Sequence, residues 1–358
     1  MNDKLGLLKE IHVEGFKSIK KMDLELKPLN IIIGANGAGK SNFIDVFKML
    51  RKHKEGNFDS YVNAVGGANG LLHLGTKETK TIVTKVCFSK KDIEYHINLE
   101  WNERDSFSIG RDSFSTRGGG TVTLTEPENL FRLFQAVNKY ISSFRCFHFN
   151  DTTNSSSLKQ GGLLVRDNLY LQEDGGNLAS ILYRLKNTEN LHSHYSDIVD
   201  AVRIIAPYFD DFVLEPDERR ISLRWKQKNS DILFETFDFS DGTIRFIALA
   251  TLLLSPLDMI PDTILIDEPE LGLHPLALKI LAEMMQAVAR QRKQVIATTQ
   301  SVTLINQFQP EDIIVADRKD NQSVFRRLDK EEIKDWLDEY ALGEIWEKDI
   351  IGGTPDEF

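Results

Sequence analysis

The sequence is poor in cysteine and in long hydrophobic runs, and each shortage excludes a class of protein. Only two cysteines, Cys87 and Cys146, occur among 358 residues. Both lie in apolar, strand-like runs, so we expect buried thiols in a reducing compartment rather than a disulfide-stapled fold. The most apolar run, Phe246–Leu254, is far shorter than the roughly 20 residues that span a bilayer. It predicts a buried helix.

The sequence also has a negative net charge, and it shows neither a signal-peptide pattern nor an internal repeat. The formal net charge of −10 argues against a surface that coats nucleic acid by bulk electrostatics, so any such contact must come from a local basic patch or a partner. Residues 1–10 lack the apolar core of a signal peptide, which predicts a cytoplasmic protein. No internal repeat or long heptad block is present, so the sequence predicts no coiled-coil arm.

What the sequence does contain is a glycine-rich loop between a strand pattern and a helix pattern. Residues 34–41 read Gly-Ala-Asn-Gly-Ala-Gly-Lys-Ser and fit G-x-x-x-x-G-K-[ST] without a mismatch. Glycines let backbone N–H groups converge on an anion, and the positive end of the following helix adds to the field. We expect Lys40 to reach the β- and γ-phosphates of a nucleoside triphosphate, and Ser41 to hold its Mg²⁺. Further nucleotide-binding candidates here are Asn36, Gly37, Ala38, Gly39 and Asn42.

A short acidic pattern supplies the second half of the predicted chemistry. Residues 263–266, Thr-Ile-Leu-Ile, have the character of a buried strand, and Asp267 and Glu268 follow directly. We expect Asp267 to hold Mg²⁺ with Ser41, and Glu268 to polarise the water that attacks the γ-phosphate. Parallel sheets bind ligands at the carboxyl ends of their strands, which is where both motifs end.

Four further segments resemble the ABC-type ATPases of the RecF/SMC/OLD-like branch. Residues 239–243, Phe-Ser-Asp-Gly-Thr, resemble the signature loop, and residues 270–275, Glu-Leu-Gly-Leu-His-Pro, resemble the D-loop of that branch. Residues 295–301 resemble the strand and switch loop that follow, and residues 16–19 the start of the domain. The chain is thereby similar to the short, arm-less, AAA_21-like prokaryotic ATPases met in antiviral defence settings.

The resemblance implies an α/β fold. The expected architecture is a P-loop NTPase with an ABC-type ATPase head, a mixed sheet, an antiparallel β subdomain and a helical lobe. One ATPase domain would cover residues 1–358, with a nucleotide-binding core lobe at 1–150 and 258–328, a helical signature lobe at 165–257 and a C-terminal helical segment at 329–358.

The resemblance also assigns roles to single residues. Ser240 and Gly242 would close over the ATP of a second subunit, so that two chains sandwich two ATP molecules. Gln300 stands where the wider class usually has His, and an amide can orient water but cannot shuttle a proton; we therefore expect slow hydrolysis. Gln172 is the candidate for a glutamine that contacts Mg²⁺, although an exposed loop Gln fits equally well. Lys17 is expected at the nucleotide or, alternatively, in solvent.

The implied cofactors are ATP and Mg²⁺, and the implied partners are a second copy and a nuclease- or toprim-like effector. Nucleic acid is a candidate ligand, and no membrane is expected. Three other interpretations stay open. They are a DNA-repair ATPase of the RecF type, an ABC transporter ATPase subunit, and a binding module in which ATP only holds two subunits together.

Elsewhere the patterns predict local structure. Strands are expected at residues 8–13, 22–26, 29–33, 81–88 and 93–101. Residues 105–120 are polar and end in three glycines, which predicts a mobile excursion. Trp336 and Trp346 lie in a segment with helical spacing, and the pattern leaves open whether they pack on this protein's own core or on a partner.

Overall fold

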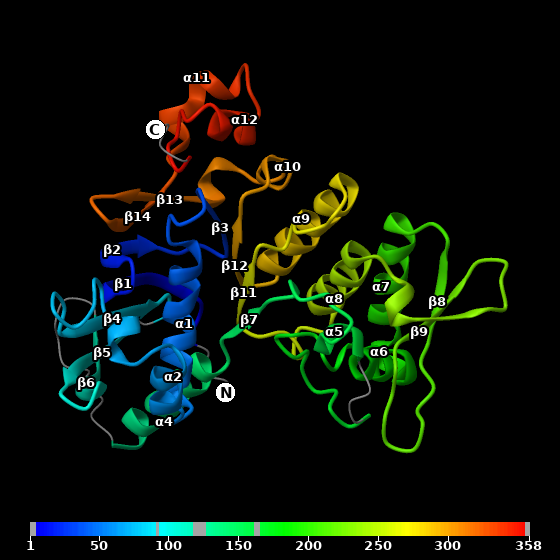
Figure 1. The fold of residues 1–358 in the computed structure, drawn as a ribbon, viewed down its shortest axis with the longest axis horizontal. Coiled ribbons are helices and arrows are strands. Elements are labelled where there is room, and N and C mark those ends of the chain that lie inside the picture. The colour runs from blue at the N-terminus through cyan, green and yellow to red at the C-terminus, as the bar shows by residue number, and fades with distance from the viewer. Residues whose placement is uncertain (1–4, 91–92, 117–126, 161–164, 355–358) are drawn as a thin grey trace. The chain divides into compact units, whose positions relative to one another are not determined.

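The structure, a computed structural model, describes residues 5–90, 93–116, 127–160 and 165–354. The chain forms two compact units. The first contains residues 1–144 and 292–358, and the second contains residues 145–291. Figure 1 labels most of the elements of both. The lobe boundaries expected from the sequence stay predictions.

The first unit contains an antiparallel sheet with the strand order β2-β1-β4-β5-β6. Its strands are β1 (Leu8–Phe16), β2 (Ile19–Glu25), β4 (Thr81–Phe88), β5 (Ile93–Asn102) and β6 (Ser106–Thr116). From Met22 to Glu25 of β2, buried and exposed residues alternate, as a sheet with one solvated face requires. The predicted strands and the antiparallel pairing of β4 with β5 are confirmed.

The expected polar excursion is wrong for residues 106–116, which form β6. Cross-strand aromatic pairs explain the difference, because Phe107 lies opposite Trp101 and Phe114 opposite Tyr95 in the register with β5. The Phe114 and Tyr95 rings lie 5.4 Å apart, and such pairs stabilise a sheet. Two widely spaced aromatics among polar residues gave too weak a periodic signal. Residues 117–120 lie outside the described residues.

The phosphate-loop strand belongs to a second group of strands in the first unit, ordered β14-β13-β3-β12. They are β3 (Leu29–Ile33), β12 (Gln294–Thr299), β13 (Ile313–Lys319) and β14 (Gln322–Arg327). Every residue of β3 is buried, and β3 runs parallel to β12 and to β13. Burial of the whole strand is typical of parallel strands that are covered on both faces.

Helices complete the first unit. They are α1 (Lys40–Lys54), α2 (Phe58–Ala64), α3 (Ala68–Leu71), α4 (Pro127–Ser142), α10 (Val302–Ile305), α11 (Lys334–Leu337) and α12 (Leu342–Glu347). Phe47 of α1 packs its ring 5.3 Å from that of Phe144, which anchors the helix that follows the phosphate loop. The two C-terminal tryptophans differ, since Trp346 is 7% exposed and Trp336 is 43% exposed. Trp346 is therefore a core residue.

The second unit combines helices with two short groups of strands. Its strands are β7 (Arg145–Phe147), β8 (Phe209–Val213), β9 (Arg224–Gln227), β10 (Leu233–Glu235) and β11 (Thr263–Asp267), with β7 parallel to β11 and the order β10-β9-β8 in the other group. Its helices are α5 (Ser157–Gln160), α6 (Leu178–Asn187), α7 (His192–Ile205), α8 (Asp241–Leu254) and α9 (Pro275–Arg290).

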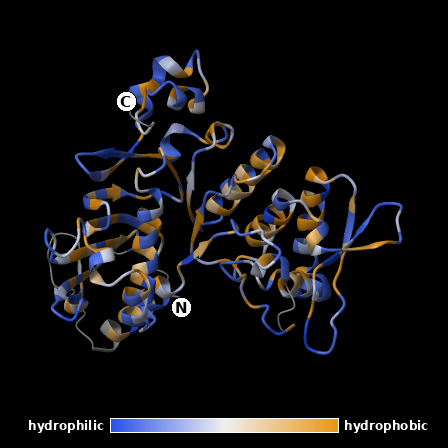
Figure 2. Cartoon of the chain, in the orientation of Figure 1, coloured by the Kyte–Doolittle hydropathy of each residue, from blue (hydrophilic) through white to orange (hydrophobic). Residues whose placement is uncertain are grey.

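Burial in the second unit follows the hydropathy of its helices. Residues 246–253 of α8 are all buried, which confirms the buried helix expected there. Figure 2 shows both hydrophobic and hydrophilic residues along α9, and the buried positions of this helix include Leu281 and Met285. In the part of the chain that the structure describes, no helix is both long and apolar enough to cross a membrane.

Candidate functional site

The glycine-rich loop connects β3 to α1 in the first unit. Gly37 and Gly39 have φ angles of 82° and 108°, which residues with a side chain rarely adopt. Apart from its chain neighbours, no described heavy atom lies within 4 Å of an ideal Cβ placed on Gly37. A Cβ on Gly39 would instead lie 2.1 Å from Ser323 Oγ. The loop is thus open at Gly37 and closely packed at Gly39. A loop with this shape can accommodate an anion.

Lys40, the first residue of α1, is held against this loop. Its side chain is buried at 5% exposure, and Nζ donates to the carbonyl oxygens of Gly34 at 2.7 Å and Ala35 at 3.0 Å. A buried ammonium group needs such acceptors. The loop therefore carries a positive charge beside its backbone N–H groups, as phosphate binding requires.

The predicted switch residue lies beside the same loop. Because β12 is parallel to β3 with Thr299 opposite Ile33, Gln300 follows at the loop's edge, and its Nε2 donates to Asn36 Oδ1 at 2.9 Å. The first unit thus brings together two predicted site residues that are far apart in the sequence. The role of Gln300 in hydrolysis stays a prediction.

Two contacts with the loop were not foreseen from the sequence. Arg318, in β13, donates to the Gly37 carbonyl oxygen at 3.3 Å. Near the C-terminus, the Gly353 carbonyl oxygen accepts from Ala35 N at 2.6 Å. The parallel pairing of β13 with β3 could have pointed to Arg318, but no local signal marks Gly353.

The turn before β2 is tied to the start of α1. Lys17 has a φ of 47°, and its Nζ lies 2.6 Å from Asp45 Oδ2. Asn42 Nδ2 donates to Ser18 Oγ at 2.7 Å. These contacts give Lys17 and Asn42 structural partners, and their contact with nucleotide stays a prediction. Ser41, the second residue of α1, is exposed.

The second unit holds the acidic pair at the end of β11. Asp267 has 13% of its side-chain surface exposed. Glu268 has a φ of 48°, a left-handed conformation that costs about 1–3 kcal/mol in a residue with a side chain and is concentrated at functional sites. The imidazole of His148, which follows β7, places Nδ1 3.7 Å from Asp267 Oδ2. Sequence reasoning missed His148.

The signature-like loop forms the N-terminus of α8. Ser240 caps this helix, because its Oγ accepts from Thr243 N at 3.1 Å. Asp241 lies 2.8 Å from Lys159 Nζ, and hydrogen bonding to Lys159 lowers the pKa of Asp241. A Cβ on Gly242 would lie 2.1 Å from the Gly272 carbonyl oxygen, so Gly is required there. Lys159 balances the acidic charge and leaves the positive end of α8 able to attract an anion.

Arg245, one turn into α8, connects three segments of the second unit. Its guanidinium group donates to the carbonyl oxygens of Phe149 at 2.8 Å, Asn150 at 2.8 Å and Leu271 at 2.9 Å. The signature-like helix is therefore fastened both to the segment after β7 and to the segment after Glu268. The sequence pattern gave no reason to single out Arg245.

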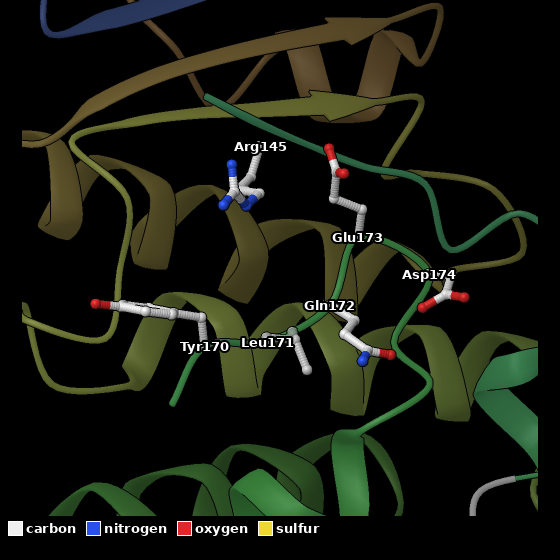
Figure 3. Close-up of a pocket in the computed structure, with 6 residues that line it drawn as sticks. All are labelled: Arg145, Tyr170, Leu171, Gln172, Glu173 and Asp174. Atoms are coloured by element: carbon white, nitrogen blue, oxygen red, sulfur yellow. The ribbon is translucent and has the colours of Figure 1, made fainter. Parts of the chain in front are cut away.

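Gln172 lies on a different feature, a pocket of about 440 Å³. Its lining residues, shown in Figure 3, are Arg145, Tyr170, Leu171, Gln172, Glu173 and Asp174. Gln172 Nε2 donates to Asp167 Oδ2 at 2.6 Å. Figure 3 shows the Gln172 amide close to Asp174, and the Tyr170 ring at the other end of the pocket. The role of Gln172 in binding Mg²⁺ stays a prediction.

The donor groups fit the expected cofactors. The phosphate loop is open at Gly37 and carries the ammonium group of Lys40. These features fit the phosphates of a nucleotide. The hydroxyl of Ser41 and the carboxylate of Asp267 are the hard oxygen ligands that Mg²⁺ prefers.

Fold and loop together define a P-loop ATPase of the AAA, SMC-head and OLD type, which confirms the predicted fold class and resemblance. The chain belongs to the family AAA_21, described as "AAA domain, putative AbiEii toxin, Type IV TA system", which matches residues 29–306. Among relatives, the OLD nuclease of Thermus scotoductus is 21% identical over 94% of this chain, and the Old nuclease of Escherichia phage P2 is 21% identical over 92%. The chain spans 68% and 62% of their respective lengths.

Solved structures show the same fold. An Smc head bound to the C-winged helix domain of ScpA has a TM-score of 0.61 at 16% identity, covering 92% of this chain and 99% of that one. An Smc head with an extended coiled coil, bound to the C-terminal domain of ScpA derived from Pyrococcus furiosus, has a TM-score of 0.58 at 17% identity, covering 93% and 98%.

Proposed function

We propose that this chain binds and hydrolyses ATP, dimerises around the nucleotide and controls a nuclease-like effector in prokaryotic antiviral defence. One observation carries the nucleotide-binding step. The phosphate loop is open at Gly37, is supported behind Gly39 and holds the ammonium group of Lys40 on its own carbonyl oxygens. This arrangement suits a triphosphate, whose charge Lys40 and the loop N–H groups offset.

The hydrolytic step uses side chains from both sequence motifs. Ser41 and Asp267 are proposed as protein ligands of the Mg²⁺ that accompanies ATP, and this ion supplies charge neutralisation on the phosphate oxygens. Glu268 accepts a proton from the attacking water. Gln300 orients that water or a phosphate oxygen through its amide, and because an amide takes no proton at neutral pH, turnover is slow.

Dimerisation is proposed to use the N-terminus of α8. Ser240 and Gly242 would meet the γ-phosphate of the ATP held by a second copy, and the N–H groups of the first helical turn would donate to it. Asp241 would weaken such a site through its negative charge, but its pairing with Lys159 offsets that charge. Hydrolysis would then remove the group that joins the two copies.

The effector is proposed from the relatives. Two of them are named OLD nucleases, and the family description includes a putative toxin. A nuclease-like protein under the control of this ATPase fits both names. A RecF-type repair ATPase would share the ATP chemistry. Deleting the gene distinguishes the two, because loss of phage resistance supports defence and UV sensitivity alone supports repair.

Nucleotide binding is tested with a matched pair of lysine variants on α1. Lys40→Ala removes the amine that lies on the loop, whereas Lys48→Ala removes an amine that pairs with Asp45. We expect Lys40→Ala to lose ATP binding, measured by calorimetry, and Lys48→Ala to bind as the wild type does. Equal ATP affinity in the two variants would remove the phosphate loop from the proposal.

The two-copy arrangement is tested by mixing two inactive proteins. Ser240→Arg places a bulky cation where the second copy must close, so we expect it to bind ATP but not hydrolyse it. A mixed dimer of Ser240→Arg with Lys40→Ala keeps one intact composite site and should recover part of the phosphate release. If the mixed dimer forms and releases no phosphate, the signature-like loop does not act across the dimer.

A further inference from the structure

A thiol, an imidazole and a carboxylate form a chain at the carboxyl ends of β7 and β11. Cys146 Sγ lies 2.9 Å from His148 Nε2, and His148 Nδ1 lies 3.7 Å from Asp267 Oδ2. The parallel register pairs Cys146 with Leu265 and Phe147 with Ile266, so His148 comes level with Asp267. The imidazole thus connects a buried thiol to the carboxylate proposed as a Mg²⁺ ligand.

Glu173 holds the backbone at this end of β7. Cys146 N donates to Glu173 Oε1 at 2.6 Å, and His148 N donates to the Glu173 carbonyl oxygen at 3.0 Å. These two contacts fix the strand end that carries the ring. The position of the imidazole is therefore set by the main chain and by Cys146, rather than by Asp267 alone.

The chemistry of the three groups favours one tautomer of the His148 ring. A thiol is a weak S–H donor, and a Cys146 proton directed at Nε2 leaves the ring's own proton on Nδ1. That nitrogen faces Asp267. The separation of Nδ1 and Oδ2 is 3.7 Å, which is longer than a hydrogen bond but close enough for the ring dipole to act on that oxygen. A ring in this position favours one orientation of the Asp267 carboxylate.

The geometry points to His148 as a positioning residue for Asp267, with the Cys146 thiol fixing the tautomer of its ring. This inference rests on the proposed function, because it concerns the Mg²⁺ ligand of the same ATPase. The predicted contact of Gln172 with Mg²⁺ stays a separate prediction. Groups that orient a ligating carboxylate typically change metal affinity or activity by about 10–100-fold when removed.

The test measures Mn²⁺, as a probe for Mg²⁺, binding to the full chain in the presence of a non-hydrolysable ATP analogue, followed by electron paramagnetic resonance. His148→Ala should raise the Kd for Mn²⁺ by about 10–100-fold, while affinity for the analogue in EDTA stays unchanged. His148→Gln should recover part of the loss, because its amide N–H can still face the carboxylate. His194→Ala is the matched control, since that ring contacts the Leu254 carbonyl oxygen.

A second measurement needs no nucleotide. Nitrogen-15 shifts of the His148 ring in the free protein should report the tautomer with the proton on Nδ1, and Cys146→Ala should give a mixture of tautomers. Cys87→Ala, which removes the other buried thiol, should leave the His148 signals unchanged.

The outcomes distinguish failure of the proposed ATPase function from failure of the role assigned to His148. A wild-type protein that binds neither Mn²⁺ nor the analogue contradicts the proposed ATPase function itself. Normal Mn²⁺ binding by the wild type with an equal Kd in His148→Ala and His194→Ala overturns the role of His148. An Nε2-protonated ring in the wild type overturns the role of Cys146.

Discussion

Gly39 offers the sharpest test of how the phosphate loop is supported. Its φ of 108° is strained for alanine, and a Cβ would lie 2.1 Å from Ser323 Oγ, 2.8 Å from Ser323 Cβ and 2.9 Å from Ser18 Oγ. The backbone conformation costs about 1–2 kcal/mol, and overpacking a closed site typically costs about 1–3 kcal/mol more. We therefore expect Gly39→Ala to lower the free energy of unfolding by about 2–5 kcal/mol.

Gly56 supplies a matched control for this prediction. Its φ is 74°, and no described heavy atom beyond its chain neighbours lies within 4 Å of an ideal Cβ. Gly56→Ala should therefore show only the conformational cost, about 1–2 kcal/mol. Urea denaturation followed by circular dichroism measures both variants, and fluorescent ATP titration should show weaker binding for Gly39→Ala alone.

A third protein separates the clash from the strain. Adding Ser323→Gly to Gly39→Ala removes the two closest atoms, so the double variant should recover most of the difference from Gly56→Ala. If Gly39→Ala is no less stable than Gly56→Ala, β14 does not support the loop as described.

Two further predictions concern the same unit. Burial raises the pKa of Asp112, but hydrogen bonds from His53 and Lys54 outweigh this and bring it to about 2, below its ordinary 3.8. Its contribution to stability is therefore complete above pH 3.8 and is lost as the pH falls towards 2; unfolding of the wild type should show this loss, and Asp112→Asn should not. Gly353→Ala, whose Cβ would lie 2.9 Å from Val315 Cγ1, should weaken ATP binding more than Gly352→Ala, whose nearest atom is 3.8 Å away. Equal ATP affinities in those two variants would show that the C-terminal contact with the loop is dispensable.

Much of the first unit could be predicted because its signals are local. The strand at residues 29–33, the loop and the helix beginning at Lys40 lie next to one another in the sequence, and the glycine positions follow from backbone sterics alone. The position of Gln300 beside the loop depends on a less local signal. The segment at residues 295–301 resembles a switch loop, and β12, which precedes Gln300, runs parallel to β3.

The residues that escaped prediction depend on register and packing. His148 comes beside Asp267 only because β7 and β11 pair in one particular register, and nothing in the segment around it announces that pairing. Arg245 donates to three backbone carbonyl oxygens. Every residue has such an oxygen, so the sequence does not identify these partners. Trp336 and Trp346 share helical spacing, and only the packing of the folded C-terminal segment makes one exposed and the other buried.

The central claim is that ATP joins two copies of this chain, and Glu268→Gln tests it most directly. This variant keeps the phosphate-binding groups and removes the proposed base, so ATP should bind and persist. Light scattering coupled to gel filtration, with and without Mg²⁺-ATP, reports the mass. We predict a shift from the 40.8 kDa monomer to twice that mass on adding ATP, and none with Lys40→Ala. A Glu268→Gln protein that is saturated with ATP and keeps the monomer mass, or that hydrolyses ATP at the wild-type rate, would contradict the account.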